Sequence, residues 1–207
     1  MKPPLIVTID GPAGAGKSTV ARRVAQALGL RLVDTGAIYR SVAVQAERAG
    51  VGVDDAPSLA RLARNLRINF ELEGETNRVL LDGEDVSALI RTAEVSMNAS
   101  RLSRHPEVRE ALLELQREFA KNDGAVLEGR DIGTIVLPDA PLKFFLDASA
   151  EERARRRYDE LVANGADCTY EDVLREVQKR DEQDRSRSIA PLRPAEDATL
   201  LDSTEMS

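Results

Sequence analysis

Apolar positions in the first 50 residues alternate between short continuous runs and helical spacing. The runs are rich in β-branched residues, which is typical of strands buried in a parallel sheet. Small or polar residues bound the helical segments: Gly29 can end the first, and Asp34 or Thr35 can begin the second. This order predicts a parallel sheet flanked by helices, with strands over 5–9 and 30–33 and helices continuing through 20–28 and 34–47.

The pattern changes between Val51 and Arg91. Two runs in which apolar and polar residues alternate, 67–73 and 78–82, are separated by Gly74-Glu-Thr-Asn77, which is a hairpin signal. A short helix is predicted before them, over 58–65. These segments predict a small antiparallel sheet inserted into the α/β fold. An insertion without a direct part in any chemistry explains the pattern equally well.

The rest of the chain returns to the α/β pattern. Pro106 suits the first turn of a helix, and Ser149 can cap a later one. A turn is predicted at Asn122-Asp-Gly124. The predicted helices are 92–102, 107–121, 149–164 and 170–187, and the predicted strands are 125–128, 142–146 and 198–201.

Composition narrows the class of protein. With 207 residues, 42% of them apolar and only 3% aromatic, the chain can build one α/β core by aliphatic packing. The net charge of −7 argues against a general nucleic-acid binder. Cys168 is the only cysteine and His105 the only histidine, which excludes a disulfide framework and a His/Cys zinc site. Catalysis by a Cys/His pair has little support, and a reducing compartment is expected.

No stretch is apolar over the length that a membrane span needs, and Asp10 ends the first apolar run before it could serve as a signal peptide. No long apolar helix face stands out as an oligomer interface. We therefore expect a cytoplasmic monomer with neither a membrane nor a nucleic acid as partner.

The most informative motif lies between the first strand and the first helix. Gly11 to Ser18 matches G-x-x-x-x-G-K-[ST], the pattern of a phosphate-binding loop. Its glycines allow backbone N–H groups to turn inward around an anion, and the next helix points its N-terminus at the same anion. Lys17 is expected to reach the β- and γ-phosphates of ATP, and Ser18 to meet Mg²⁺ or a phosphate oxygen. A glycine-rich turn without a ligand is the alternative. The predicted ATP-binding residues are Gly11, Pro12, Ala13, Gly14, Ala15, Gly16, Lys17, Ser18 and Thr19.

Arginines are the second informative feature. Phosphoryl transfer needs positive charge around the transferred group, and the planar guanidinium binds phosphate bidentately. Several arginines occupy segments that an α/β sheet places at, or folds over, its C-terminal edge, where ligands bind. Ion pairs at the surface explain part of the set without function, above all Arg155 and Arg156. The candidate arginines are Arg40, Arg109, Arg130, Arg153, Arg157, Arg180 and Arg187.

The predicted helix over 170–187 carries charged residues at helical spacing. Arg180, Asp184 and Arg187 share one face, and Asp181 and Arg185 form a neighbouring pair. Solvated pairs at this spacing account for the pattern without function. A mobile lid whose arginines close over phosphates accounts for it equally well.

Signals for a dedicated metal site are weak. The nearest candidate for a Walker B aspartate is Asp147, which is better placed to cap the helix that begins at 149. The Asn-Lys-x-Asp and Asp-x-x-Gly motifs of GTPase switches are absent. A small phosphotransferase that holds Mg²⁺ through the nucleotide, Ser18 and water therefore fits better than a GTPase.

Five motifs spread over almost the whole chain can be taken together. They are Ile9-Asp-Gly-Pro-Ala-Gly-Ala-Gly-Lys-Ser-Thr19, Asp34-Thr-Gly-Ala-Ile-Tyr-Arg40, Gly83-Glu-Asp-Val-Ser87, Glu128-Gly-Arg-Asp-Ile-Gly-Thr134 and Arg180-Asp-Glu-Gln-Asp-Arg-Ser-Arg187. Together they resemble the bacterial cytidylate kinase family. Many families share the phosphate loop, but the Gly-Arg-Asp and Asp-Arg-Ser-Arg stretches are much more specific.

The resemblance implies a P-loop kinase that uses ATP and Mg²⁺ to phosphorylate CMP and dCMP, in line and without a covalent enzyme intermediate. It implies a core over about 1–35, 106–148 and 190–207. It also implies an inserted nucleoside-monophosphate-binding subdomain over about 36–105 and a lid over about 149–189. The chain departs from the family at its end: it stops at Ser207, where relatives often continue into a final helix. We expect this departure to affect stability more than chemistry.

The resemblance also assigns roles to residues. Two arginines would hold the acceptor phosphate, three residues would read the cytosine edge, and two would meet the sugar or phosphate. Thr35 stands where the family often has Ser and keeps the hydroxyl. The CMP-binding residues implied are Thr35 (phosphate or base), Arg40 and Arg130 (phosphate), Ser100, Arg109 and Asp131 (base), Asp184 (sugar) and Arg187 (sugar or phosphate). The catalytic residues implied are Lys17, Arg130, Arg153, Arg157 and Arg187, of which Arg153 and Arg157 belong to the lid.

Two other interpretations stay open. From the residues alone, Ser100 is as well explained by a solvated hydroxyl and Asp131 by a pair with Arg130. A P-loop kinase for another nucleotide or a small metabolite keeps the loop but not the base-reading residues. A nucleotide-dependent switch or binding module would bind ATP without any phosphorylated acceptor.

Overall fold

The computed structural model describes residues 4–121, 124–163 and 165–206. Asn122 and Asp123 of the predicted turn, and Asn164 at the end of a predicted helix, lie outside the described residues. The chain divides into two compact units: a first unit of Met1–Ile6 and Ala21–Glu128, and a second unit of Val7–Val20 and Gly129–Ser207.

The main sheet has five strands in the order β2-β6-β1-β7-β8. The pairs β2–β6, β1–β7 and β7–β8 are all parallel, so the predicted parallel α/β sheet is confirmed. The predicted strands lie within one or two residues of their expected places, at β1 (Ile6–Asp10), β2 (Arg31–Asp34), β6 (Ala125–Gly129), β7 (Leu142–Asp147) and β8 (Thr199–Asp202).

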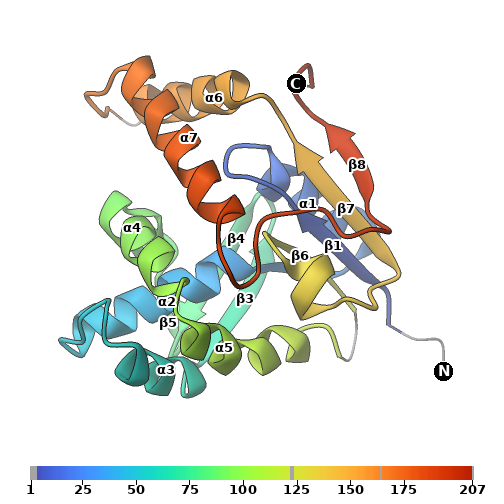
Figure 1. The fold of residues 1–207 in the computed structure, drawn as a ribbon. Helices are drawn as coiled ribbons and strands as arrows, with labels where there is room; N and C mark the ends of the chain where they lie inside the picture. The colour runs from blue at the N-terminus through green and yellow to red at the C-terminus, as the bar shows by residue number, and fades with distance from the viewer. Residues whose placement is uncertain (1–3, 122–123, 164, 207) are drawn as a thin grey trace. The chain divides into compact units, whose positions relative to one another are not determined.

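The second unit combines β1, β7 and β8 with a pair of helices. Ser149 caps α6 (Ala150–Ala163), because its Oγ accepts a hydrogen bond from the Glu152 amide, and Thr169 caps α7 (Tyr170–Arg185). The two helices lie side by side (Figure 1) around a buried cluster of Ala154, Val173 and Val177. This hydrophobic contact fixes how the charged faces of α6 and α7 meet each other.

The first unit is built from helices around an aliphatic core. Asp34 caps α2 (Thr35–Arg48) as predicted, and Pro106 takes the first position of α5 (Pro106–Glu118). The other helices of this unit are α3 (Ala56–Arg64), the short η1 (Leu89–Arg91) and α4 (Ala93–Leu102). The buried residues Ile38, Leu59, Leu102 and Leu112 show how aliphatic side chains fill this core.

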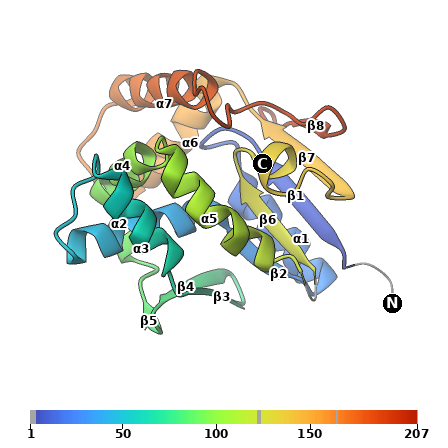
Figure 2. The same cartoon turned by 60° about the horizontal axis from the view of Figure 1, so that its bottom comes forward.

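The inserted sheet is confirmed as a separate antiparallel sheet of three strands, β3 (Ile68–Glu73), β4 (Thr76–Leu81) and β5 (Glu84–Asp85). It lies beneath α2 in Figure 2, and Gln45 of α2 donates a hydrogen bond to Asp82. Helix α1 (Lys17–Leu28) holds the tip of the hairpin, because Arg22 donates to the Glu75 carbonyl and Gln26 to the Gly74 carbonyl. The insertion is therefore anchored to the helix that follows the phosphate loop.

One element was missed by the sequence analysis. The five residues after Gly129-Arg-Asp131 form a single π-helical turn, Ile132–Val136. The carbonyl of Asp131 accepts from the amides of both Ile135 and Val136, which widens the turn. Among the helices that the structure describes, none is both long and apolar enough to cross a membrane.

Gly11 is expected to tolerate no side chain. Its φ is +147°, and a Cβ at this position would lie 1.9 Å from the Leu146 carbonyl oxygen of β7. We predict that Gly11→Ala lowers the free energy of unfolding by about 3 kcal/mol or more, measured by urea denaturation. The matched control is Gly50→Ala, where φ is +64° but nothing lies within 4 Å, and the cost is about 1 kcal/mol. Equal costs at the two positions would contradict the contact with β7.

Candidate functional site

The phosphate-binding loop lies between β1 and α1, as the motif requires. Gly14 and Gly16 adopt φ values of +79° and +84°, which side chains rarely allow. Lys17, at the first position of α1, donates a hydrogen bond from Nζ to the Pro12 carbonyl at 2.6 Å. Ser18 is exposed in the first turn of the helix. The loop thus has the backbone turns and the lysine that a bound polyphosphate needs.

Two side chains from elsewhere in the second unit donate hydrogen bonds to backbone carbonyls of this loop. Arg153 of α6 donates from Nη1 to the Ala13 carbonyl at 3.1 Å, and Ser203 donates from Oγ to the Ala15 carbonyl at 3.0 Å. A Cβ on Gly14 would lie 3.0 Å from the Cβ of Arg153, so the loop runs directly against α6. The sequence analysis missed Ser203 altogether, since it carries no motif and lies far from the loop in sequence.

Asp10 is a buried acid at the end of β1, immediately before the loop. Its side chain is 4% exposed and accepts hydrogen bonds from the amides of Ile132 (2.9 Å) and Gly133 (2.7 Å). Burial raises its pKa to about 6, against the lowering effect of these two hydrogen bonds; Asp131 adds to the rise and Lys17 opposes it. Asp10 therefore ties the start of the π-helical turn to the start of the phosphate loop.

Asp184 lies between two of the predicted arginines. It is 2% exposed and accepts from Nε of Arg130 at 3.0 Å and from Nη2 of Arg187. Burial alone would raise the pKa of Asp184, but the charges of Arg130, Arg187 and Arg180 outweigh it and hold the pKa below its usual value. Solvated pairs do not explain this face of α7, because the carboxylate is buried and shared by arginines.

The arginines of α6 differ sharply from one another. Arg153 is 2% exposed and is paired with Asp181 of α7, whereas Arg157 is exposed and paired with Glu160. The expected pairing of Asp181 with Arg185 is wrong, because Asp181 turns inward to α6. Arg155 forms the expected surface pair, with Glu152.

Four predicted residues lie in the first unit. Thr35 donates from Oγ1 to the Glu128 carbonyl at 2.8 Å, and Arg40 is paired with Asp34 at 2.6 Å. The guanidinium of Arg109 lies 5.6 Å from the centre of the Tyr39 ring. The fourth, Ser100, is half-buried on α4. Within the described residues, Nε of Arg40 is buried without a hydrogen-bond partner.

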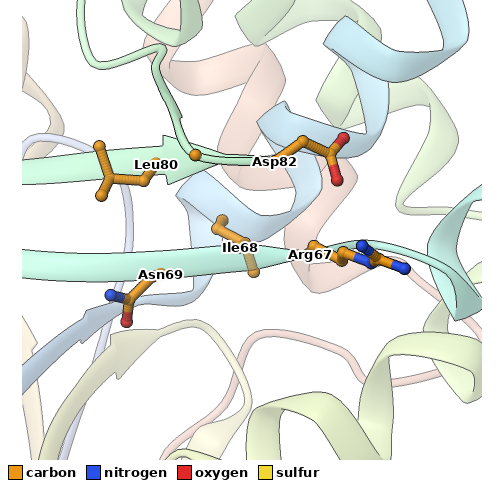
Figure 3. Close-up of a pocket in the computed structure, with 6 residues that line it drawn as sticks. Arg67, Ile68, Asn69, Leu80 and Asp82 are labelled. Carbon is orange, nitrogen blue, oxygen red and sulfur yellow. The ribbon is translucent and has the colours of Figure 1, made fainter.

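The structure thus gathers one group of predicted residues in each unit. The second unit contains the phosphate loop together with four predicted residues, Arg130, Asp131, Asp184 and Arg187. A separate pocket lies on the small sheet (Figure 3), and none of its lining residues is a predicted binding residue. That pocket is lined by Arg67, Ile68, Asn69, Leu80, Asp82 and Gly83. Within the described parts of the chain, no three His, Cys, Asp or Glu residues are grouped so that they could hold a metal ion.

Comparison with known proteins gives a consistent result over nearly the whole chain. Residues 7–207 match the family model described as cytidylate kinase. A relative named cytidylate kinase from Citrifermentans bemidjiense is 53% identical over 98% of this chain and 87% of its own. Relatives of the same name from Photobacterium profundum and from an Exiguobacterium strain are 50% and 49% identical, over 98% and 100% of this chain and 89% and 92% of their own.

We predict a distinctive pH dependence from Asp10. Its pKa of about 6 in the folded state lies above the usual 3.8, so the folded state binds more protons between these values, and Asp10 makes the protein less stable as pH rises from about 4 to 6. Asp10→Asn removes this titration. The free energy of unfolding of the variant minus that of the unmodified protein should therefore rise by up to about 3 kcal/mol between pH 4 and 7. Denaturant titrations at pH 4, 5, 6 and 7 measure the difference, and a flat difference would show that Asp10 titrates normally.

Proposed function

The chain belongs to the cytidylate kinase family, and on that basis we propose that it transfers the γ-phosphoryl group of ATP to CMP and dCMP, giving CDP and dCDP. The observation that carries the proposal is the phosphate loop: its glycines have the required positive φ, and Lys17 stands at the start of α1. The proposal places the enzyme in the cytoplasm as a monomer.

The donor is ATP, held on the loop of residues 11–19. Inward N–H groups and the N-terminus of α1 bind the phosphates, and Lys17 stabilises the charge that develops on the β- and γ-phosphates. Mg²⁺ fits this site because Ser18 offers an exposed hydroxyl oxygen beside the phosphates, and Mg²⁺ commonly takes few protein ligands in addition to phosphate and water. When bound, the ion neutralises charge on the phosphate oxygens.

Arginines are assigned to the acceptor phosphate. Arg40 offers a buried Nε that has no partner among the described residues. Arg130 is held in place through Nε by Asp184 and through Nη1 by the Gly129 carbonyl, and its guanidinium is assigned to a phosphate oxygen. Thr35 lies at the start of α2, where its O–H donates to the Glu128 carbonyl, and Arg187, fixed by the same Asp184, contacts the sugar or the phosphate.

Three residues select the base. The cytosine edge presents an amino donor beside ring nitrogen and carbonyl acceptors. Asp131 accepts from the amino group, and Arg109 donates to the acceptors, steadied by the face of the Tyr39 ring. Ser100 supplies a hydroxyl that can do either. Asp184 also meets a sugar hydroxyl.

The transfer is in line, from ATP to an oxygen of the acceptor phosphate, with no covalent enzyme intermediate. No general base is required, because the second pKa of a phosphate monoester is about 6 and the acceptor is largely a dianion at neutral pH. The lid segment, residues 149–189, closes and expels water that would otherwise hydrolyse ATP. Arg157 brings its charge to the transferred group in this closed state.

The experiment that tests the proposal is a coupled ADP-release assay with ATP and Mg²⁺ against CMP, dCMP, UMP, AMP, GMP and shikimate, with each product identified by mass. We expect fast turnover with CMP and dCMP alone. Turnover on another acceptor would still support ATP binding by the loop, but it would contradict the base-reading roles of Ser100, Arg109 and Asp131. ATP binding without transfer to any acceptor would favour a nucleotide-dependent switch.

Lys17→Ala should slow turnover far more than it affects folding. A charged donor aimed at the transferred phosphate is worth about 2.7–4 kcal/mol in the transition state, so kcat should fall at least 100-fold. Circular dichroism and a thermal melt check that the variant remains folded. A folded variant with nearly normal kcat would remove Lys17 from the mechanism.

Asp131→Ala should relax selection for cytosine. The loss of the acceptor for the amino group removes a hydrogen bond to a charged partner, so kcat/KM for CMP should fall by a factor of about 10 or more while the value for UMP changes little. The ratio of kcat/KM for CMP to that for UMP is the measurement. An unchanged ratio in a folded variant would assign Asp131 a role in the fold only.

A further inference from the structure

The phosphate loop has a backbone requirement that its motif does not express. When successive N–H groups point inward to an anion, the carbonyl groups of the same peptides point outward, into the protein. A buried carbonyl without a donor costs free energy, and the loop would relax by rotating the peptide. Each outward carbonyl therefore needs a donor behind the loop.

Two outward carbonyls have such donors. Arg153 of α6 serves Ala13, and Ser203 serves Ala15. These donors lie 140 and 188 residues from their partners in sequence, and both are buried. The motif itself supplies neither of them.

Four hydrogen bonds hold Arg153 at this position. Nε donates to the Ala148 carbonyl at 2.9 Å, and Nη1 and Nη2 donate to the two carboxylate oxygens of Asp181 at 2.9 and 2.5 Å. Nη1 also donates to the Ala13 carbonyl. Because the Asp181 carboxylate balances the charge of Arg153 inside the protein, the pair presents little net charge to the phosphates.

The hydroxyl of Ser203 is directed at the loop in a similar way. Nη1 of Arg156 lies 3.3 Å from Oγ and occupies a lone pair of the hydroxyl, so the O–H must act as a donor. The Asp147 carbonyl, 3.1 Å away, already accepts the Ser203 amide at 2.8 Å. That carbonyl has a second lone pair, so the single O–H of Ser203 is shared between the Asp147 carbonyl and the Ala15 carbonyl, which lies 3.0 Å away. Arg153 and Arg156 are three residues apart on α6, so one helix controls both donors.

We propose that Arg153 and Ser203 are positioning residues for the ATP site: they hold the Ala13 and Ala15 carbonyls, so that the N–H groups of the same peptides, those of Gly14 and Gly16, point toward the phosphates. Asp181 and Arg156 orient Arg153 and Ser203. The part of the inference that concerns KM for ATP and for CMP rests on the proposed function. It assigns Arg153 to the back of the loop in place of the lid role that the family resemblance implies.

Two variants test the proposal. Ser203→Ala removes one donor with little change in volume. The double variant Arg153→Met with Asp181→Leu removes the donor to Ala13 together with the buried carboxylate that would otherwise be left unpaired. The matched control is Arg155→Met, which breaks the exposed pair with Glu152 on the same helix. Thermal melts check that all three are folded.

Two measurements separate positioning from a general structural role. The first is the Kd for ADP, from titration with a fluorescent ADP analogue without any acceptor. The second is KM for ATP and for CMP. We expect Ser203→Ala to raise both the Kd for ADP and the KM for ATP about two- to tenfold, the value of one hydrogen bond. The double variant should raise them at least as much. KM for CMP should stay within twofold of its unmodified value for every variant. Arg155→Met should leave the Kd for ADP and both KM values unchanged.

Folded variants that bind ADP as tightly as the unmodified protein would overturn the proposal. A rise in KM for CMP without a rise in Kd for ADP would overturn it as well, because the residues would then act on the acceptor. The ADP titration needs no acceptor, so it tests the loop even if CMP is not the substrate. Failure of the acceptor assay and failure of this inference are therefore separate results.

Discussion

The direction of a few peptide groups in the phosphate loop is the constraint on which the rest of the second unit depends. A loop that presents N–H groups on one side must hide carbonyl groups on the other, and the hidden carbonyls need donors. The pairing of α6 with α7 around Ala154 and Val173 brings Arg153 to one of them. The chain segment after β8 brings Ser203 to another. The same helix pair places Asp184 beside Arg130, so the helices that support the phosphate loop also hold Arg130, which is proposed to bind the acceptor.

A second constraint acts at the end of β1, where a carboxylate is buried at the cost of stability. Asp10 accepts two amide hydrogen bonds from the π-helical turn, and these only partly offset the burial that raises its pKa. An apolar residue would stabilise this position more simply, but it would leave the amides of Ile132 and Gly133 without an acceptor. The benefit of the carboxylate is geometric: it fixes the Gly129-Arg-Asp131 segment, which carries two residues proposed to bind CMP, relative to the phosphate loop.

Local rules explain why much of the fold could be predicted from the sequence. The β-branched runs, the caps at Asp34 and Ser149 and the hairpin at Gly74 depend on residues within a few positions of one another, and each lies where it was expected. The partners of Asp181 and Ser203 could not be predicted, because each is fixed by contacts from elements 28 or more residues away. Helical spacing alone favoured Arg185 for Asp181, since i,i+4 pairing ignores which face of α7 is covered by α6. The π-helical turn was missed for the same reason: its amides are directed by Asp10, 122 residues earlier.

Burial also decides which arginines can supply charge to a transferred phosphoryl group. Arg153 and Arg157 are one turn apart on α6, and sequence alone treats them alike. Arg153 forms a buried ion pair with Asp181, so the net charge of the pair is close to zero and its electrostatic effect on the phosphates is small. The pair between Arg157 and Glu160 is exposed, with both side chains in water, and such pairs are weak enough to exchange for a phosphate. In the proposed mechanism the positive charge for transfer is therefore assigned to Lys17 and Arg157, while the buried Arg153 is assigned to positioning the loop.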